Sequence, residues 1–324
     1  MYNNHLLAFG TASFGLGKSE ASYDSEDVKK AEIAIKTISE LKINYIDTAN
    51  VYQNGNSEMI LGEIIKKDKS LRDKIVLQSK CGIKYSGKNQ NRYYDTSKKG
   101  IICAVEKSLL RLNTDRLDVL LLHRPDPLMD PIEVSQAFEE LHTQGKVLHF
   151  GVSNFTPQQI QNLKNYFAFP IIVNQIQFNL MQTVILDSGI EGFQENINPH
   201  GVHGTLEYCK INNIRVQAWS PIVRGILTGG KIDPSLSIAL ASKGDLLSQI
   251  SRTKKILTDI SKKYNTFPES VLISWILKHP IKILPVLGSL DPKIIKACAE
   301  GKNIHLSRED WFNLYRIARK KEIP

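Results

Sequence analysis

Residues 27–47, DVKKAEIAIKTISELKINYID, contain two hydrophobic periodicities in succession. The run NYID that ends the stretch is short, apolar and partly aromatic, which is typical of a buried strand. The part before it is periodic in a different way, because its apolar residues recur at the three- and four-residue spacing of one helix face. These residues are Val28, Ala31, Ile35, Ile38 and Leu41. The stretch therefore predicts a helix followed by a strand.

The same alternation continues along the whole chain. Eight short apolar or β-branched runs are separated by segments with helical periodicity; they are LLAFG (6–10), NYID (44–47), KIVLQSK (74–80), LDVLLLH (117–123), VLHFGVS (147–153), PIIVNQ (170–175), IRVQAWS (214–220) and IKILPVLGS (281–289). Repeated strand–helix units predict an α/β fold, and eight of them favour a (β/α)₈ TIM barrel. A doubly wound sheet is the alternative that the count alone leaves open. No linker divides the chain, so we expect a single barrel domain over residues 1–324, with a further helix at the C-terminus.

Capping residues mark where two of the helices begin. Thr96 or Ser97 precedes the periodic segment KKGIICAVEKSLLRL, and Thr156 followed by Pro157 opens PQQIQNLKNYF. Hydroxyl side chains are favoured at the N-cap and proline in the first helical turn.

Composition excludes several classes of protein. The formal charge of +9 comes from lysines scattered in small groups among acids, which is typical of solvated helix faces, so no nucleic-acid partner is expected. The positive field still favours an anionic cofactor. Four separated cysteines indicate reduced thiols, and neither a signal segment nor a membrane span is visible. We therefore expect a cytoplasmic protein that does not associate with membranes.

Two connections are longer than a barrel needs. They run from Cys81 to Asp95, after the third predicted strand, and over residues 178–204, after the sixth. Loops that follow barrel strands lie at the rim where active sites form, so both are candidate substrate loops. A disordered surface insertion is the alternative for the second.

Polar groups stand at the ends of four predicted strands. Asp47, Lys80 and His123 each follow an apolar run, as does the pair Ser153–Asn154. Each alone has a simple structural explanation, since strand ends meet solvent. In a barrel, however, these ends converge on one rim, so the side chains are expected to lie close together.

Tyr52, five residues after Asp47, completes a specific chemistry. A tyrosine exchanges its proton poorly near neutral pH, and a nearby ammonium such as Lys80 is expected to lower its pKa. Asp47 would keep Lys80 protonated, and His123 would orient a substrate oxygen. This set suits the reduction of a carbonyl, in which a cofactor delivers hydride and Tyr52 donates a proton to the developing alkoxide.

The ordered motifs resemble those of the aldo-keto reductases over nearly the whole chain. They are IDTANVYQNGNSE, IVLQSKCG, LDVLLLHRPDP, GKVLHFGVSNF, NQIQFN and VQAWSPIVRG. The likeness is strongest to the bacterial YdhF-like oxidoreductase branch. This resemblance implies an NADP(H)-dependent barrel enzyme with Asp47, Tyr52, Lys80 and His123 as its catalytic tetrad and a small-molecule carbonyl as its substrate.

The resemblance also implies a set of cofactor contacts. Three polar residues would hold the nicotinamide carboxamide, Trp219 would stack on its ring, and Thr11 would lie near the nicotinamide and ribose. The carboxamide residues are Ser153, Asn154 and Gln175. Those along the pyrophosphate would be Ser220, Pro221, Ile222, Arg224 and Gly225, and those near the adenosine end Gly288, Ser289 and Lys293.

The adenosine end departs from the family pattern. Ile294 stands where relatives usually carry an arginine or glutamine, and Ala297 and Cys298 replace a Glu-Asn pair. Isoleucine cannot bind a 2′-phosphate, although Lys293 or Lys296 offers a point charge nearby. NADP(H) is the cofactor expected from the family, and NAD(H) is the alternative.

Other functions remain to be weighed. A cofactor-binding regulatory subunit, like the potassium-channel β subunits of this family, would use the same fold with little turnover. A metal-dependent hydrolase lacks clustered ligands, since His200 and His203 stand alone, and no metal site is expected. Cys81 beside Lys80 is expected to be an inert thiol. Tyr52, Trp219 and Phe14 would line a pocket for an apolar or aromatic carbonyl.

Overall fold

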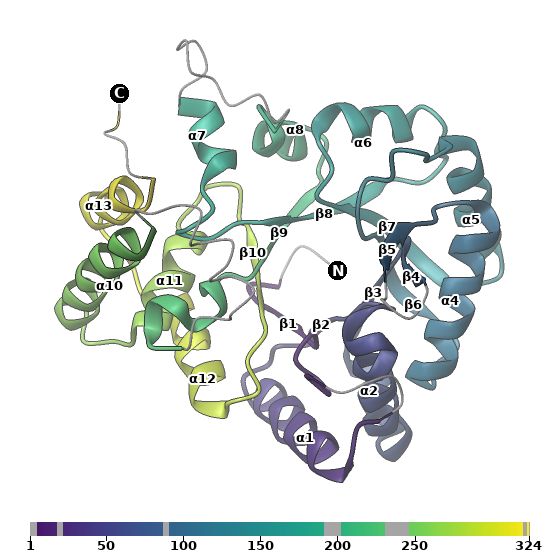
Figure 1. Ribbon diagram of the computed structural model, residues 1–324, viewed down its shortest axis with the longest axis horizontal. Coiled ribbons are helices and arrows are strands. Elements are labelled where there is room, and N and C mark those ends of the chain that lie inside the picture. Colours follow the sequence, from purple (N-terminus) through teal and green to yellow (C-terminus); the bar gives the residue numbers. More distant parts are fainter. Residues whose placement is uncertain are drawn as a thin grey trace.

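Eight parallel strands close into a barrel that is surrounded by helices (Figure 1). The computed structural model describes residues 5–17, 22–86, 91–190, 202–230, 246–319 and 323. Around the barrel the strands follow the order β1-β10-β9-β8-β7-β6-β3-β2. The predicted (β/α)₈ fold is thereby confirmed, and the doubly wound alternative is excluded because the sheet is closed.

All eight predicted strands are present in the barrel. Their bounds are β1 Ala8–Gly10, β2 Tyr45–Asp47, β3 Val76–Cys81, β6 Leu117–Leu122, β7 Val147–Ser153, β8 Ile171–Gln177, β9 Arg215–Trp219 and β10 Leu284–Leu287. Described helices connect or flank them: α1 Ser25–Glu40, α2 Asn56–Lys67, α3 Lys69–Lys74, α4 Lys98–Leu112, α5 Pro131–Thr143, α6 Pro157–Lys164, α7 Val184–Ile190, α8 Thr205–Ile211, α10 Leu246–Lys263, α11 Pro268–Leu277, α12 Pro292–Glu300 and α13 Arg308–Arg319.

Strand β6 is largely apolar on both faces because both faces are buried. In β6, Val119 and Leu121 pack inside the barrel, whereas Leu120 and Leu122 belong to the outer core beneath the helices. A strand covered on both sides needs a continuous apolar run, which is why LDVLLL shows no alternation.

Helix caps occur where the sequence places them. Ser97 caps α4 by accepting from the Gly100 amide. Thr156 and Gln159 form a reciprocal capping box at α6, with Pro157 in the first turn. Asp24 caps α1, so this helix begins two residues before the predicted start.

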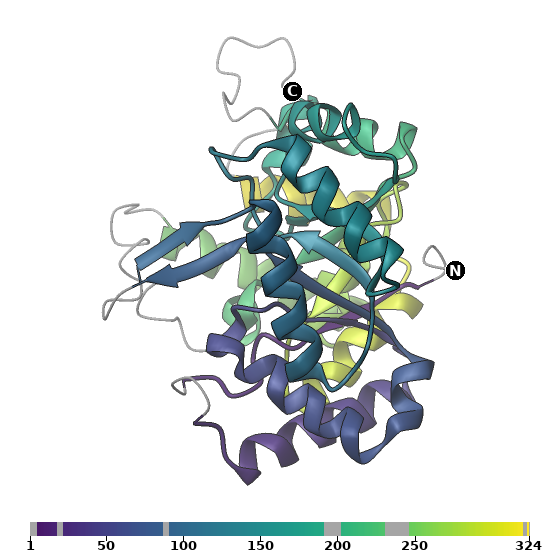
Figure 2. The ribbon, with the colours of Figure 1, turned by 90° about the vertical axis from the view of Figure 1, so that its right-hand side faces the viewer.

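The first long connection forms a β-hairpin that the sequence analysis did not predict. Strands β4 (Ile83–Ser86) and β5 (Asn91–Tyr94) pair antiparallel, and Figure 2 shows them in blue, projecting from the barrel. The tip of the hairpin lies outside the described residues. In the second long connection, residues 184–190 form helix α7, and residues 191–201 lie outside the described part of the chain.

The predicted C-terminal helix, α13, is clamped against α11 by two tryptophans. The rings of Trp275 and Trp311 stack with centroids 5.1 Å apart, and each indole nitrogen donates to the other residue's carbonyl oxygen, at 3.2 and 2.9 Å. The Tyr315 hydroxyl of α13 donates to Asp187 of α7 at 2.5 Å. The C-terminal helix therefore supports the start of the second rim loop.

None of the helices described has the length and apolar content needed to cross a bilayer. All four cysteines are free thiols. Their separation agrees with the expected reduced state.

Gly62 allows α2 and α4 to pack closely. A methyl group on Gly62 would lie 1.9 Å from the Arg111 carbonyl oxygen, a backbone atom that cannot rotate away. We expect Gly62→Ala to lower the free energy of unfolding by about 2–3 kcal/mol, as other overpacking substitutions do. Chemical denaturation measures this.

Gly288→Ala is the matched control for that measurement. A methyl group there meets no atom within 4 Å, and the backbone is not left-handed. The free energy of unfolding should change by less than about 1 kcal/mol. Equal stability of the two variants would show that the contact at Gly62 is not tight.

Candidate active site

Four polar side chains from different segments meet at the carboxyl-terminal rim of the barrel. Asp47 is the last residue of β2, Lys80 lies near the end of β3, and His123 directly follows β6. Tyr52 begins a 3₁₀ helix in the loop after β2. The strands β2, β3 and β6 are neighbours in the barrel, so the fold brings together residues that are far apart in the sequence.

Lys80 lies at the centre of this group. Its ammonium donates to Asp47 at 2.7 Å, to the Thr48 carbonyl oxygen at 2.8 Å and to the Tyr52 hydroxyl oxygen at 3.0 Å. An ammonium has three protons, so its hydrogen-bonding capacity is filled. Burial disfavours the charge, but Asp47 and Tyr52 outweigh burial and raise the pKa of Lys80. Lys80 therefore remains a buried cation.

Asp47 is held by a layer of buried amides. Gln78 donates to Asp47 at 2.6 Å, and it exchanges two hydrogen bonds of 2.9 and 3.1 Å with Gln217 across the barrel. Gln175 donates to Gln217 at 2.8 Å. The sequence analysis did not identify Gln78 or Gln217 as site residues. The period of two in strand β3 places Gln78 on the same side as Lys80, which is the signal that would have found it.

The loop after β2 carries Tyr52 back over Lys80. The Thr48 and Asn50 amides donate to the Gln78 and Lys80 carbonyl oxygens, at 2.9 and 3.2 Å, which keeps the loop beside β3. Gln53 and Asn54 then adopt left-handed backbone conformations, with φ of 49° and 56°. Such conformations are uncommon for residues other than glycine and often occur at functional sites.

The pKa of Tyr52 differs from the expectation. Burial raises it, Lys80 opposes that rise, and the net direction is upward. The prediction that Lys80 lowers the pKa of Tyr52 below its ordinary value is therefore wrong, because desolvation of the phenolate outweighs the ammonium. Tyr52 consequently holds its proton firmly and is available as a proton donor.

His123 is uncharged and free to bind a ligand. Burial, followed by the charges of Lys80, Arg124 and Arg92, holds the pKa of His123 well below its ordinary value. Its ring packs edge-on against Tyr52, with centroids 5.7 Å apart. Nδ1 is buried without a hydrogen-bond partner, and the side chain bonds to no other described residue. A buried polar group of this kind calls for an external partner.

Comparison with known proteins identifies the family of the chain. The family model described as "Aldo/keto reductase family" matches residues 6–319. The chain belongs to the aldo/keto reductase family.

Relatives extend this assignment. Oxidoreductase YdhF of Escherichia coli is 33% identical over 88% of this chain and 86% of its own, which supports the branch expected from the motifs. The 6-dehydroglucose reductase of Agrobacterium fabrum is 32% identical over 93% and 92% of the two chains. The structure of the thermostable aldo-keto reductase Tm1743 with the inhibitor epalrestat superposes on this chain with a TM-score of 0.72. The match covers 96% of this chain and 94% of Tm1743, and because the two sequences are 23% identical it supports the fold alone.

Aldo/keto reductases are oxidoreductases that use nicotinamide cofactors. The residues expected to hold the nicotinamide are hydrogen-bonded to one another. Asn154 has a left-handed backbone with φ of 63°, accepts from the Trp219 indole at 3.1 Å and donates to Ser153 at 2.7 Å. Ser153 in turn donates to the Gln175 carbonyl oxygen at 2.9 Å. These four residues form one connected group beside the tetrad, at the ends of β7, β8 and β9. Amide and indole groups of this kind suit a carboxamide and a flat ring.

Two further residues expected at the site are buried. Thr11 is fully buried and donates to the Thr48 hydroxyl at 2.8 Å. Phe14 is 1% exposed and packs on Phe9, so the prediction that it lines the pocket is wrong. The turn at residues 11–16 folds its ring inward, under the loop.

The segment after β9 is strained where the pyrophosphate is expected. Positive φ angles occur at Ser220 (54°), Val223 (54°), Arg224 (52°) and Gly225 (77°). For a β-branched valine this is a genuine outlier. Pro221 and Ile222 lie between them, and an Asn179 side chain holds the Ser220 carbonyl oxygen at 3.0 Å. Backbone strain maintained in this way is typical of a ligand-binding loop.

The adenosine end follows β10, the strand next to β9. The space above Gly288 is open, and Ser289 accepts from the Asp291 amide at 3.1 Å. Lys293 is exposed on the first turn of α12, which Asp291 caps. Ile294 packs against the core, so it contributes no polar group. The residues present fit an extended nucleotide, with Lys293 as the exposed cation on that turn.

Cys81 and the His200–His203 pair are the other features that the sequence raised. Burial raises the pKa of Cys81 to about 12, so this thiol is inert. His200 lies outside the described residues, and the described part of the chain contains no group of three or more potential metal ligands.

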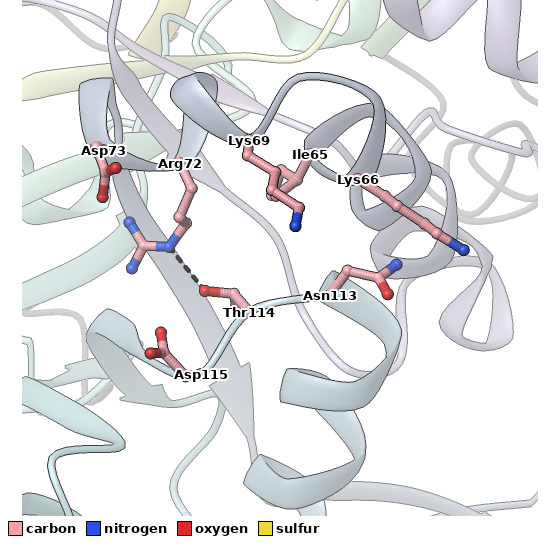
Figure 3. A pocket seen from close by; sticks show the side chains of 8 residues that line it. All are labelled: Ile65, Lys66, Lys69, Arg72, Asp73, Asn113, Thr114 and Asp115. Carbon is pink, nitrogen blue, oxygen red and sulfur yellow. Dashed lines mark hydrogen bonds between the residues drawn. The ribbon is translucent and has the colours of Figure 1, made fainter.

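A surface hollow between α2, α3 and the end of α4 is separate from this site (Figure 3). Arg72 points into it and donates to Thr114 at 3.0 Å. The same guanidinium is paired with Asp118 at 2.9 Å. The charge of Arg72 is therefore already balanced, and the hollow lies at the amino-terminal side of the barrel, away from Tyr52.

Proposed function

We propose that this aldo/keto reductase reduces an aldehyde or ketone to the alcohol, with Tyr52 as the proton donor. One observation carries the proposal: the Tyr52 hydroxyl lies 3.0 Å from the buried Lys80 ammonium and beside a neutral imidazole whose Nδ1 has no hydrogen-bond partner among the described residues. Proton donor, cation and free imidazole are the groups that a developing alkoxide needs.

Each residue has a distinct part in the mechanism. A bound nicotinamide cofactor supplies the hydride that reaches the carbonyl carbon. His123 donates a hydrogen bond to the carbonyl oxygen and so orients it, and Tyr52 transfers its proton to that oxygen as negative charge develops. Lys80 stabilises the phenolate left behind, and Asp47 keeps Lys80 charged and in place.

NADP(H) is the cofactor we propose, with NAD(H) as the alternative. Lys293 is an exposed cation on the first turn of α12, but it offers a point charge without the bidentate geometry of an arginine. Asp291, the helix cap, places a carboxylate in the same turn and accepts from the Lys293 amide at 2.8 Å. These opposing charges predict a modest preference for NADPH over NADH, about tenfold or less.

The test is turnover of each reduced cofactor with a panel of aldehydes, followed by absorbance. We expect reduction of at least one aldehyde, faster with NADPH than with NADH. A strong NADH preference would show that Lys293 does not replace the missing arginine. Tight cofactor binding without turnover across the panel would instead identify a regulatory subunit.

The rate should depend little on pH near neutrality. The pKa of Tyr52 is raised above its ordinary value and that of His123 is held well below its own, so neither titrates between about pH 6 and 9. We expect kcat to vary less than about threefold over this range and to fall only at pH values above the ordinary pKa of a tyrosine, where Tyr52 loses its proton. An inflection near pH 6.5 would show that His123 titrates normally.

We place the enzyme in the cytoplasm as part of this proposal. All four cysteines are free, as expected for a reducing compartment. Fractionation of cells that express the protein checks this, and recovery outside the cytoplasmic fraction would contradict it.

A further inference from the structure

Arg124 brings a second positive charge to the active site. It directly follows His123 at the end of β6, and its guanidinium lies 5.7 Å from the centroid of the Trp219 ring. Arg124 is partly buried and forms neither an ion pair nor a hydrogen bond with any described residue. A partly desolvated guanidinium normally has an anionic or aromatic partner, and here only the ring is present.

A third cation lies nearby on the hairpin. Arg92 of β5 is exposed, and the one hydrogen bond of its side chain within the described structure is a long one of 3.4 Å to the Tyr85 hydroxyl. Both arginines act on His123, since their charges contribute to lowering its pKa. Arg92 lies on β5, whose partner strand β4 follows β3, and His123 and Arg124 follow β6, the barrel strand next to β3.

No described carboxylate forms an ion pair with Arg124 or Arg92. Asp95 pairs with Lys84 and also accepts from Ser97. Asp126 accepts from the Thr96 hydroxyl at 2.8 Å and from the Leu128 amide at 2.9 Å.

The remaining acid of the site, Asp47, is committed to Lys80, which neutralises that pair. Among the described residues, Arg124 and Arg92 are thus cations at the rim without an ion pair. Such cations attract anionic ligands.

We infer that the carbonyl substrate carries an anionic group, a carboxylate or a phosphate, which Arg124 binds while the carbonyl oxygen meets Tyr52 and His123. Arginine matches both anions through two parallel hydrogen bonds. Arg92, which is more exposed, adds attraction at longer range. The inference rests on the proposed carbonyl reduction, and it adds a polar requirement to the apolar pocket that the sequence suggests.

Matched substrates test the inference. The first pair is 4-oxobutanoate and its methyl ester, and the second is glyceraldehyde 3-phosphate and glyceraldehyde. In wild type we expect kcat/KM at least about tenfold higher for the anion of one pair, and that pair identifies the carboxylate or the phosphate. Arg124→Met should bring the ratio of the two kcat/KM values close to one, and Arg124→Lys should restore part of it. Lys107→Met, which removes an exposed charge on α4, should leave the wild-type ratio.

Two kinetic outcomes would overturn the inference. One is a wild-type kcat/KM ratio near one for both pairs, and the other is an equal loss of kcat/KM for the anion and its neutral partner in Arg124→Met. A binding measurement separates this inference from the proposed function. Isothermal titration calorimetry follows the binding of the product anions 4-hydroxybutanoate and glycerol 3-phosphate to the cofactor-loaded protein. Binding of one anion that weakens at least about tenfold in Arg124→Met supports the inference even if no carbonyl is reduced. Absence of binding to wild type contradicts it even if neutral aldehydes are reduced.

Discussion

Tyr52→Phe should lower kcat/KM for carbonyl reduction by about 10²–10⁴-fold, the range typical of a lost general acid. The substitution removes the hydroxyl that lies 3.0 Å from Lys80 and leaves the ring that packs on His123. Cofactor affinity should change little, because the hydroxyl touches none of the expected cofactor residues. Steady-state kinetics and a fluorescence titration of the cofactor measure the two effects separately.

Tyr166→Phe provides the control, since this tyrosine is 48% exposed and its hydroxyl makes no hydrogen bond to the described residues. It should retain wild-type kinetics. If Tyr52→Phe retains them as well, Tyr52 is not the proton donor.

Lys80→Met should lower the free energy of unfolding by about 3–5 kcal/mol, because it leaves the Asp47 carboxylate buried without its counter-charge. Lys80 is 1% exposed and Asp47 2%, so water cannot replace the lost partner. Turnover should fall too, since nothing then stabilises the Tyr52 phenolate. Chemical denaturation measures the first effect.

Lys67→Met is the matched control. The Lys67–Glu32 pair is as short, at 2.6 Å, but its side chains are 61% and 36% exposed. Its loss should lower the free energy of unfolding far less than the loss of the buried Lys80–Asp47 pair. The double variant Lys80→Met with Asp47→Asn should recover part of the lost stability. Similar losses in Lys67→Met and Lys80→Met would mean that the buried pair does not stabilise the barrel.

Much of the fold could be predicted because local patterns determine it. Runs such as LDVLLL identify strands that are buried on both faces, and Thr156–Pro157 identifies a helix start. The meeting of Asp47, Lys80 and His123 followed from topology, since the ends of barrel strands share one rim. Tyr52 could be recognised only from the chemistry that the other three residues make possible.

What could not be predicted depends on non-local packing. The Gln78–Gln217 bonds join strands that are not adjacent in the barrel, and no spacing in the sequence announces them. Phe14 turns into the core because the loop folds over it. Burial raises the pKa of Tyr52 and the charge of Lys80 lowers it, and only the folded structure shows which effect is larger.

The link between α7 and α13 is of the same kind. Asp187 and Tyr315 are far apart in the sequence, and neither lies in a recognisable motif. The unbalanced charge of Arg124 likewise became visible only when its neighbours were known.

The transfer of deuterium from cofactor to product tests the central proposal most directly. A reduced cofactor carrying deuterium at the hydride position is incubated with the protein and an aldehyde, and the alcohol is examined by mass spectrometry. We predict one deuterium on the carbinol carbon of the alcohol, and none on that carbon when the label is in the solvent. An alcohol whose carbon carries no cofactor deuterium, or the absence of any alcohol, would contradict the proposed carbonyl reduction.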